Sequence, residues 1–238
     1  MDPWSRLTKP HQQQLVAWLF IATAFLIVCH VLVTLCIPQS GGESLAWQIK
    51  REFLLQEERN IPTWFSSLGW IVAAQAAYAC FQLSPTSPSR KIWVFLAAFL
   101  LFLSCDETAM IHENLDTLLG MNVFTWRFPE TWIVTWPITL GPFVLVVLGW
   151  LGVRLRQALR GSPDATTLLL VGTVVFFSGA AGVDFTRNFM GLKSLGWVRQ
   201  VEIIVEESLE MVAVVVILFG LLLHQRVLQG RTGERTPP

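Results

Sequence analysis

The chain has 238 residues, of which 53% are hydrophobic and 14% are charged, and its mean hydropathy is +0.53. These values exclude an ordinary soluble domain of this length and indicate an integral membrane protein. Basic and acidic residues both number 17, so the overall charge argues neither for nor against a nucleic-acid or acidic partner. For an integral membrane protein we expect the lipid bilayer as a partner and no nucleic acid. The cysteines fall in apolar stretches without paired spacing, which is typical of small buried side chains rather than disulfides.

Six stretches are apolar enough to cross a bilayer as helices, since a hydrocarbon core of about 30 Å needs about 20 residues. They cover residues 15–37, 62–83, 91–111, 132–154, 165–184 and 201–224. Residues 43–59 place Leu45, Ile49 and Phe53 opposite Lys50 and Arg51, which predicts a short amphipathic helix on the membrane surface. The predicted fold is an all-α polytopic membrane bundle of about six transmembrane helices, forming one domain over 1–225 before a disordered tail over 226–238.

Lysine and arginine gather at alternate ends of these stretches. Because such residues are enriched in cytoplasmic loops, we expect both termini and the tail to be cytoplasmic and the protein to lie in an inner (cytoplasmic) membrane. The residues that indicate this side are Arg6, Lys9, Arg90, Lys91, Arg154, Arg156, Arg160, Arg226, Arg231 and Arg235.

Aromatic and small residues give further expectations about packing. Tryptophans near the predicted span ends, such as Trp70 and Trp93, are typical of aromatic belts at the membrane interface. We expect His30 to be a packed core residue and His224 to be interfacial. The small residues of 178–182 predict close contact between helices.

Ionisable side chains also occur inside the apolar stretches. The third contains Ser104, Asp106 and Glu107, followed by His112 and Glu113, and the fifth ends at Asp184. The last contains Glu202, Glu206, Glu207 and Glu210. A charge deep in a span costs about 3 kcal/mol, so such residues normally face the interior of a bundle. The predicted topology puts both groups at similar depth in the outer half, and we expect them to meet, with Asp106 and Glu113 on one helical face.

Carboxyls that face one another without enough lysine or arginine need protons, a metal or water. We favour a metal site, in which one imidazole among oxygen ligands suits iron or manganese, with zinc as a third choice. An enzyme built on it would act on a lipid-like or quinone-like substrate, but the pattern identifies no catalytic residue. The expected ligands are Asp106, His112, Glu113, Glu206 and Glu210, with Ser104, Glu107, Asp184, Glu202 and Glu207 as a supporting polar cluster.

Two alternatives stay open beside the metal site. In the first, the polar core only fixes helix packing in a subunit of a larger complex, which would have a membrane-protein partner besides the lipid bilayer. In the second, the carboxyls handle protons or cations, although the inner halves of the spans carry hardly any ionisable side chain. Glu57 and Glu58 are expected to form the solvated face of the surface helix.

Three motifs resemble those of an uncharacterised group of bacterial polytopic membrane proteins. They are NIPTWFSS at 60–67, SxDExxxxHE at 104–113 and EExLEM at 206–211. The resemblance implies the six-span layout and brings no activity, cofactor or catalytic residue with it.

Overall fold

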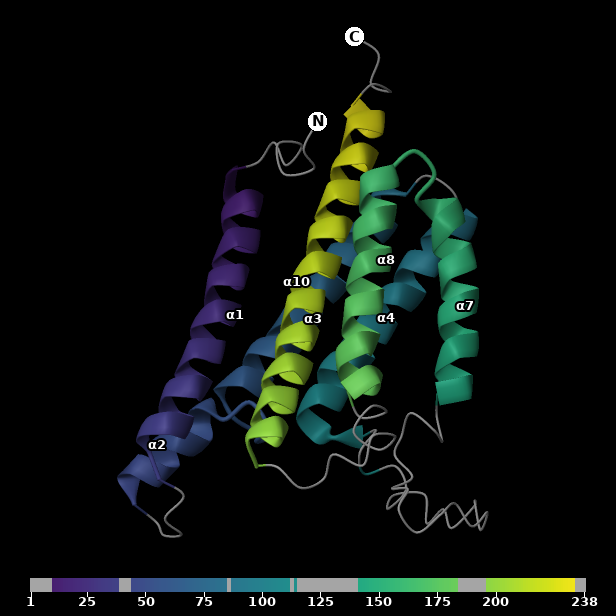
Figure 1. The fold of residues 1–238 in the computed structure, drawn as a ribbon. Helices are drawn as coiled ribbons and strands as arrows, with labels where there is room; N and C mark the ends of the chain where they lie inside the picture. Colours follow the sequence, from purple (N-terminus) through teal and green to yellow (C-terminus); the bar gives the residue numbers. More distant parts are fainter. Residues whose placement is uncertain are drawn as a thin grey trace, which may run out of the picture.

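The computed structural model describes residues 10–38, 44–84, 87–111, 114, 141–183 and 196–233, and the regular elements among them are helices (Figure 1). The all-α fold class is therefore confirmed for this part of the chain. The helices are α1 (Pro10–Cys36), α2 (Leu45–Phe53), α3 (Ile61–Leu83), α4 (Ser87–Ala109), α7 (Gly141–Ala158), α8 (Pro163–Phe177), the π-helix η2 (Ser178–Val183) and α10 (Gly196–Gly233).

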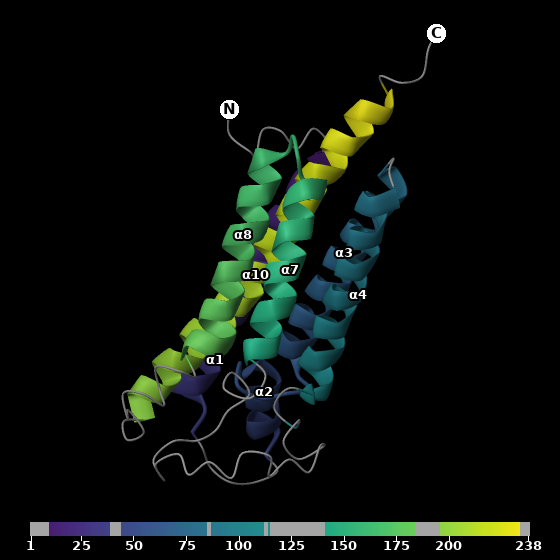
Figure 2. The same ribbon diagram turned by 90° about the vertical axis from the view of Figure 1, so that its right-hand side faces the viewer.

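The long helices run along one another as a bundle around α10 (Figures 1 and 2). At 38 residues α10 is about 57 Å long, and it packs against α1, α3, α8 and η2. Helix α4 packs against α3, and α7 packs against α4. Helix α1 begins and α10 ends at the same end of the bundle, which also carries the basic ends of α4 and α7.

Four of the described helices are long and apolar enough to cross a membrane, over residues 11–36, 90–109, 163–183 and 196–231. The membrane character of the chain rests on these helices, and the remaining two predicted spans are not established. Helix α3 is not among these four, and it carries two buried serines, Ser66 and Ser67. The fourth predicted span, 132–154, lies partly outside the described residues, and α7 begins at Gly141.

Three predicted boundaries are wrong. The surface helix ends at Phe53 rather than at residue 59, since the following backbone turns toward Asn60, which caps α3. Helix α4 ends at Ala109 because Met110 takes a left-handed φ of 52°. Helix α10 continues to Gly233, so residues 226–233 are helical rather than part of a disordered tail.

Consecutive side chains toward the C-terminal end of α10 tie it to several other elements. The Nδ1 atom of His224 lies 2.9 Å from Ser162 Oγ, in the loop before α8. The Nε2 atom of Gln225 donates to the Ala76 carbonyl of α3 at 2.7 Å, and Arg226 donates to Gln12 Oε1 of α1 at 2.9 Å. This polar layer fixes the register of α10 against the bundle.

His224 and the tryptophans Trp70 and Trp93 were expected at the membrane interface, and both expectations are wrong. His224 is fully buried and stacks on Trp93 of α4, with ring centroids 5.0 Å apart. Trp70 and Trp93 are 1% and 0% exposed, so they belong to the core rather than to an aromatic belt. The other half of the expectation holds, because His30 is a fully buried, hydrogen-bonded core residue.

Candidate carboxyl cluster

The site starts from a hydroxyl contact that sets α4 against α3. Ser104 is 5% exposed, and its Oγ lies 2.8 Å from Ser67 Oγ. The Ser67 hydroxyl also lies 3.1 Å from the Ser104 carbonyl oxygen, to which it donates. Since each hydroxyl is used in this contact, Ser104 acts in helix packing and sets the rotation of the α4 end that carries Asp106 and Glu107.

Carboxyls from three segments converge on Glu210 of α10. Four charges that act on Glu210 belong to Glu206 and Glu207 of the same helix, Glu107 of α4 and Glu58 of the connection before α3. All five side chains are partly buried. Glu107, from the third predicted span, is thus close enough to Glu210 of the last span for its charge to act on that carboxyl.

The carboxyl that α4 contributes to this convergence is Glu107. Asp106 is its neighbour in the chain, and successive residues on an α-helix point about 100° apart. The two side chains therefore leave α4 in different directions. The sequence predicts Asp106 as a metal ligand and Glu107 in a supporting role, and this assignment stays a prediction.

Glu58 is the member of the cluster that sequence reasoning missed. It had been assigned to a solvated helix face, but residues 54–60 form an irregular connection folded against the bundle. Its position two residues before the NIPTWFSS motif, at a predicted membrane boundary, was the available signal.

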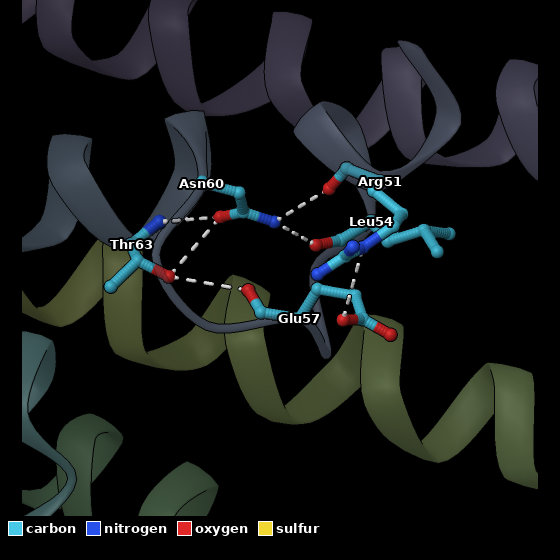
Figure 3. A network of polar contacts seen from close by, with 5 residues as sticks. All are labelled: Arg51, Leu54, Glu57, Asn60 and Thr63. Carbon is cyan, nitrogen blue, oxygen red and sulfur yellow. Dashed lines mark hydrogen bonds and ion pairs between the residues drawn. The ribbon is translucent and has the colours of Figure 1, made fainter. Parts of the chain in front are cut away.

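A network around Asn60 holds this connection in shape (Figure 3). Asn60 Oδ1 accepts from the Thr63 amide at 3.2 Å and caps α3, and its Nδ2 donates to the carbonyls of Arg51 at 3.1 Å and Leu54 at 2.5 Å. Glu57 points to Arg51, with 3.9 Å between Oε2 and Nε. The two adjacent glutamates thus differ, because Glu57 faces a cation and Glu58 acts on Glu210.

The π-helix η2 brings the backbone close to the carboxyls of α10. Gly179 is buried there, and a Cβ atom added to it would lie 2.9 Å from the Glu206 carbonyl oxygen and 3.2 Å from Glu210 Cγ. Only glycine permits this approach without a shift of the neighbouring helix. The expected close contact of the small residues 178–182 is therefore made with the acidic face of α10.

The predicted metal-ligand set is only partly within the described residues. His112, Glu113 and Asp184 lie outside them. We expected Asp106 and Glu113 to share a face of one continuous helix, but α4 ends at Ala109, before Met110. Within the described ranges, histidine, cysteine, aspartate and glutamate side chains form no group of three arranged to hold a metal ion.

Comparison with known proteins gives a family but no activity. A family model described as a domain of unknown function, DUF8692, matches residues 16–225. No curated protein and no solved structure matches the chain.

Proposed function

Because the chain belongs to the DUF8692 family, whose description assigns no activity, we propose a function from its residues: an integral membrane protein that binds a metal cation at the carboxyl cluster. One observation supports this proposal: the charges of Glu207, Glu107, Glu206 and Glu58 all act on Glu210. Like charges held close together in a partly buried site repel one another unless a cation or protons compensate them.

The donor atoms decide which cation fits. The described members of the cluster offer carboxylate oxygens only, and oxygen ligands suit manganese and iron better than copper. His112 and Glu113 lie two and three residues after Met110 in the chain, and we assign them the remaining ligand positions. One imidazole would favour iron or manganese over magnesium or calcium.

A proton path across the membrane is the weaker alternative. Below Glu210, residues 211–223 of α10 carry no ionisable side chain, and His224 follows them about 21 Å away along the helix. Helix α10 is the most buried of the membrane-spanning candidates, with 78% of its apolar window inside the bundle. Protons that enter at the carboxyl cluster would find no titratable group on α10 for most of this distance.

Metal analysis of the purified protein tests the proposal. Protein prepared in mild detergent is expected to bind about one manganese or iron per chain, and Glu210→Gln and Glu58→Gln are expected to weaken this binding at least tenfold. Glu57→Gln is the matched control, because Glu57 neighbours Glu58 but faces Arg51. Folded wild-type protein that neither retains nor takes up manganese or iron would refute the metal site and leave a packing role for the carboxyls.

A further inference from the structure

We propose that His30 of α1 is an acid-sensitive latch, which holds the connection at residues 54–60 and thereby keeps Glu58 in the carboxyl cluster. The functional consequence for cation binding rests on the proposed function, whereas the latch itself does not. Its geometry lies wholly within α1, α2 and the connection between α2 and α3.

The hydrogen bond at His30 requires the neutral imidazole. The side chain is fully buried, and its Nδ1 atom accepts from the Leu55 amide at 3.1 Å. A ring nitrogen that accepts from a backbone N–H carries no proton, so the proton of the neutral ring is on Nε2. The buried Nε2 atom has no hydrogen-bond partner among the described residues. The ring is thus held by its Nδ1 contact alone.

Protonation would turn this contact from attraction to repulsion. An imidazolium donates from both nitrogens, so its Nδ1–H would face the Leu55 N–H. The ring would also become a cation in a buried site, where Lys50 of α2 already acts on it. Lys50 is itself buried, and its Nζ atom donates to the Ile37 carbonyl at 2.6 Å. The other charged groups on the elements packed here are Arg51 and Glu52 of α2, Glu57, Glu58 and Arg59 of the connection, and Arg199, Glu202, Glu206, Glu207, Glu210, Arg226 and Arg231 of α10.

Leu55 transmits the state of His30 to the cluster. Its side chain is buried in a small core with Leu26 of α1 and with Ile203 and Met211 of α10. Glu58 follows three residues later, within a connection that Asn60 holds through two backbone carbonyls. If acid releases the Leu55 amide from His30, the connection loses its hydrogen bond to α1. Glu58 would then lose its fixed place near Glu210.

Hydrogen–deuterium exchange with peptides that resolve single amides tests the latch in detergent-purified protein kept in chelator. After correction for intrinsic exchange rates, protection of the Leu55 amide is expected to fall at least tenfold between pH 7.5 and pH 5. The Trp64 amide, which donates to the Asn60 carbonyl at 3.0 Å, is the internal reference and is expected to keep its protection. A parallel loss at both amides, or no loss at Leu55, would overturn the latch.

Two substitutions test whether His30, and not another group that titrates between pH 7.5 and pH 5, controls protection of the Leu55 amide. The Oδ1 atom of an asparagine can take the place of Nδ1 and cannot be protonated, so His30→Asn is expected to keep Leu55 protected at both pH values. His30→Phe is expected to leave Leu55 unprotected at both. A wild-type pH dependence that persists in folded His30→Asn would refute the proposal. The chelator removes metal from the sample. The protection of the Leu55 amide would therefore be the same if the protein proved to bind no metal.

Discussion

The hydroxyl oxygens of Ser67 and Ser104 lie 2.8 Å apart in the buried contact between α3 and α4. This contact joins two of the three motifs noted in the sequence, since Ser67 ends NIPTWFSS and Ser104 begins SxDExxxxHE. It therefore links the helix that follows Glu58 to the helix that carries Glu107.

Ser104→Ala is expected to lower the free energy of unfolding by about 1–2 kcal/mol, because it leaves a buried Ser67 hydroxyl without that partner. Ser67→Ala should cost a similar amount, and the double variant should cost less than the sum, as expected for two residues in contact. Thermal unfolding of the detergent-purified variants measures these differences. Thr108→Ala, at a more exposed hydroxyl on the same helix, is the control and should change stability by less than about 0.5 kcal/mol.

Gly179→Ala is expected to destabilise the protein by about 1–3 kcal/mol, since the added methyl group would force η2 away from α10. The matched control is Gly149→Ala on α7, where an added Cβ would meet nothing within 4 Å. That control should be neutral or slightly stabilising, because alanine is the better helix former. Equal melting temperatures for the two variants would contradict the close contact of Gly179 with α10.

Asn60 allows a graded test of the connection in Figure 3. Asn60→Asp keeps an oxygen that can cap α3 but loses the two bonds that Nδ2 donates to the carbonyls of Arg51 and Leu54. Asn60→Ala loses both the α3 cap and the two bonds that Nδ2 donates. We expect losses of about 1–2 kcal/mol for the aspartate variant and about 2–4 kcal/mol for the alanine variant. Denaturation of both variants by heat gives the order, and a less stable aspartate variant would show that the cap matters little.

The Gln225 side chain, toward the C-terminal end of α10, provides a test of the polar layer formed by His224, Gln225 and Arg226. Gln225→Met keeps the length of the side chain but removes the donor to the Ala76 carbonyl, and is expected to cost about 1–3 kcal/mol. Gln157→Met, at an exposed position of α7, is the control and should leave stability nearly unchanged. A loss of the same size in both variants would argue against a specific role for the Gln225 bond.

The sequence by itself determined the helical class, the approximate extent of the apolar segments and the places along them where acidic side chains occur. It could do so because a long apolar segment in a membrane must satisfy its backbone within a helix, and because buried carboxyls turn toward other helices. The positions of Asp106, Glu107 and Glu210 along their helices followed from counting residues alone.

Tertiary structure decided which side chains take part. Helical periodicity fixes how residues are spaced around one helix, but not how that helix is rotated against its neighbours. That rotation depends on contacts such as Ser67 with Ser104 and Gly179 with α10, which selected Glu107 as the α4 carboxyl at Glu210. The place of Glu58 depended in the same way on Asn60, and the burial of His224 depended on its contacts with Trp93 and Ser162.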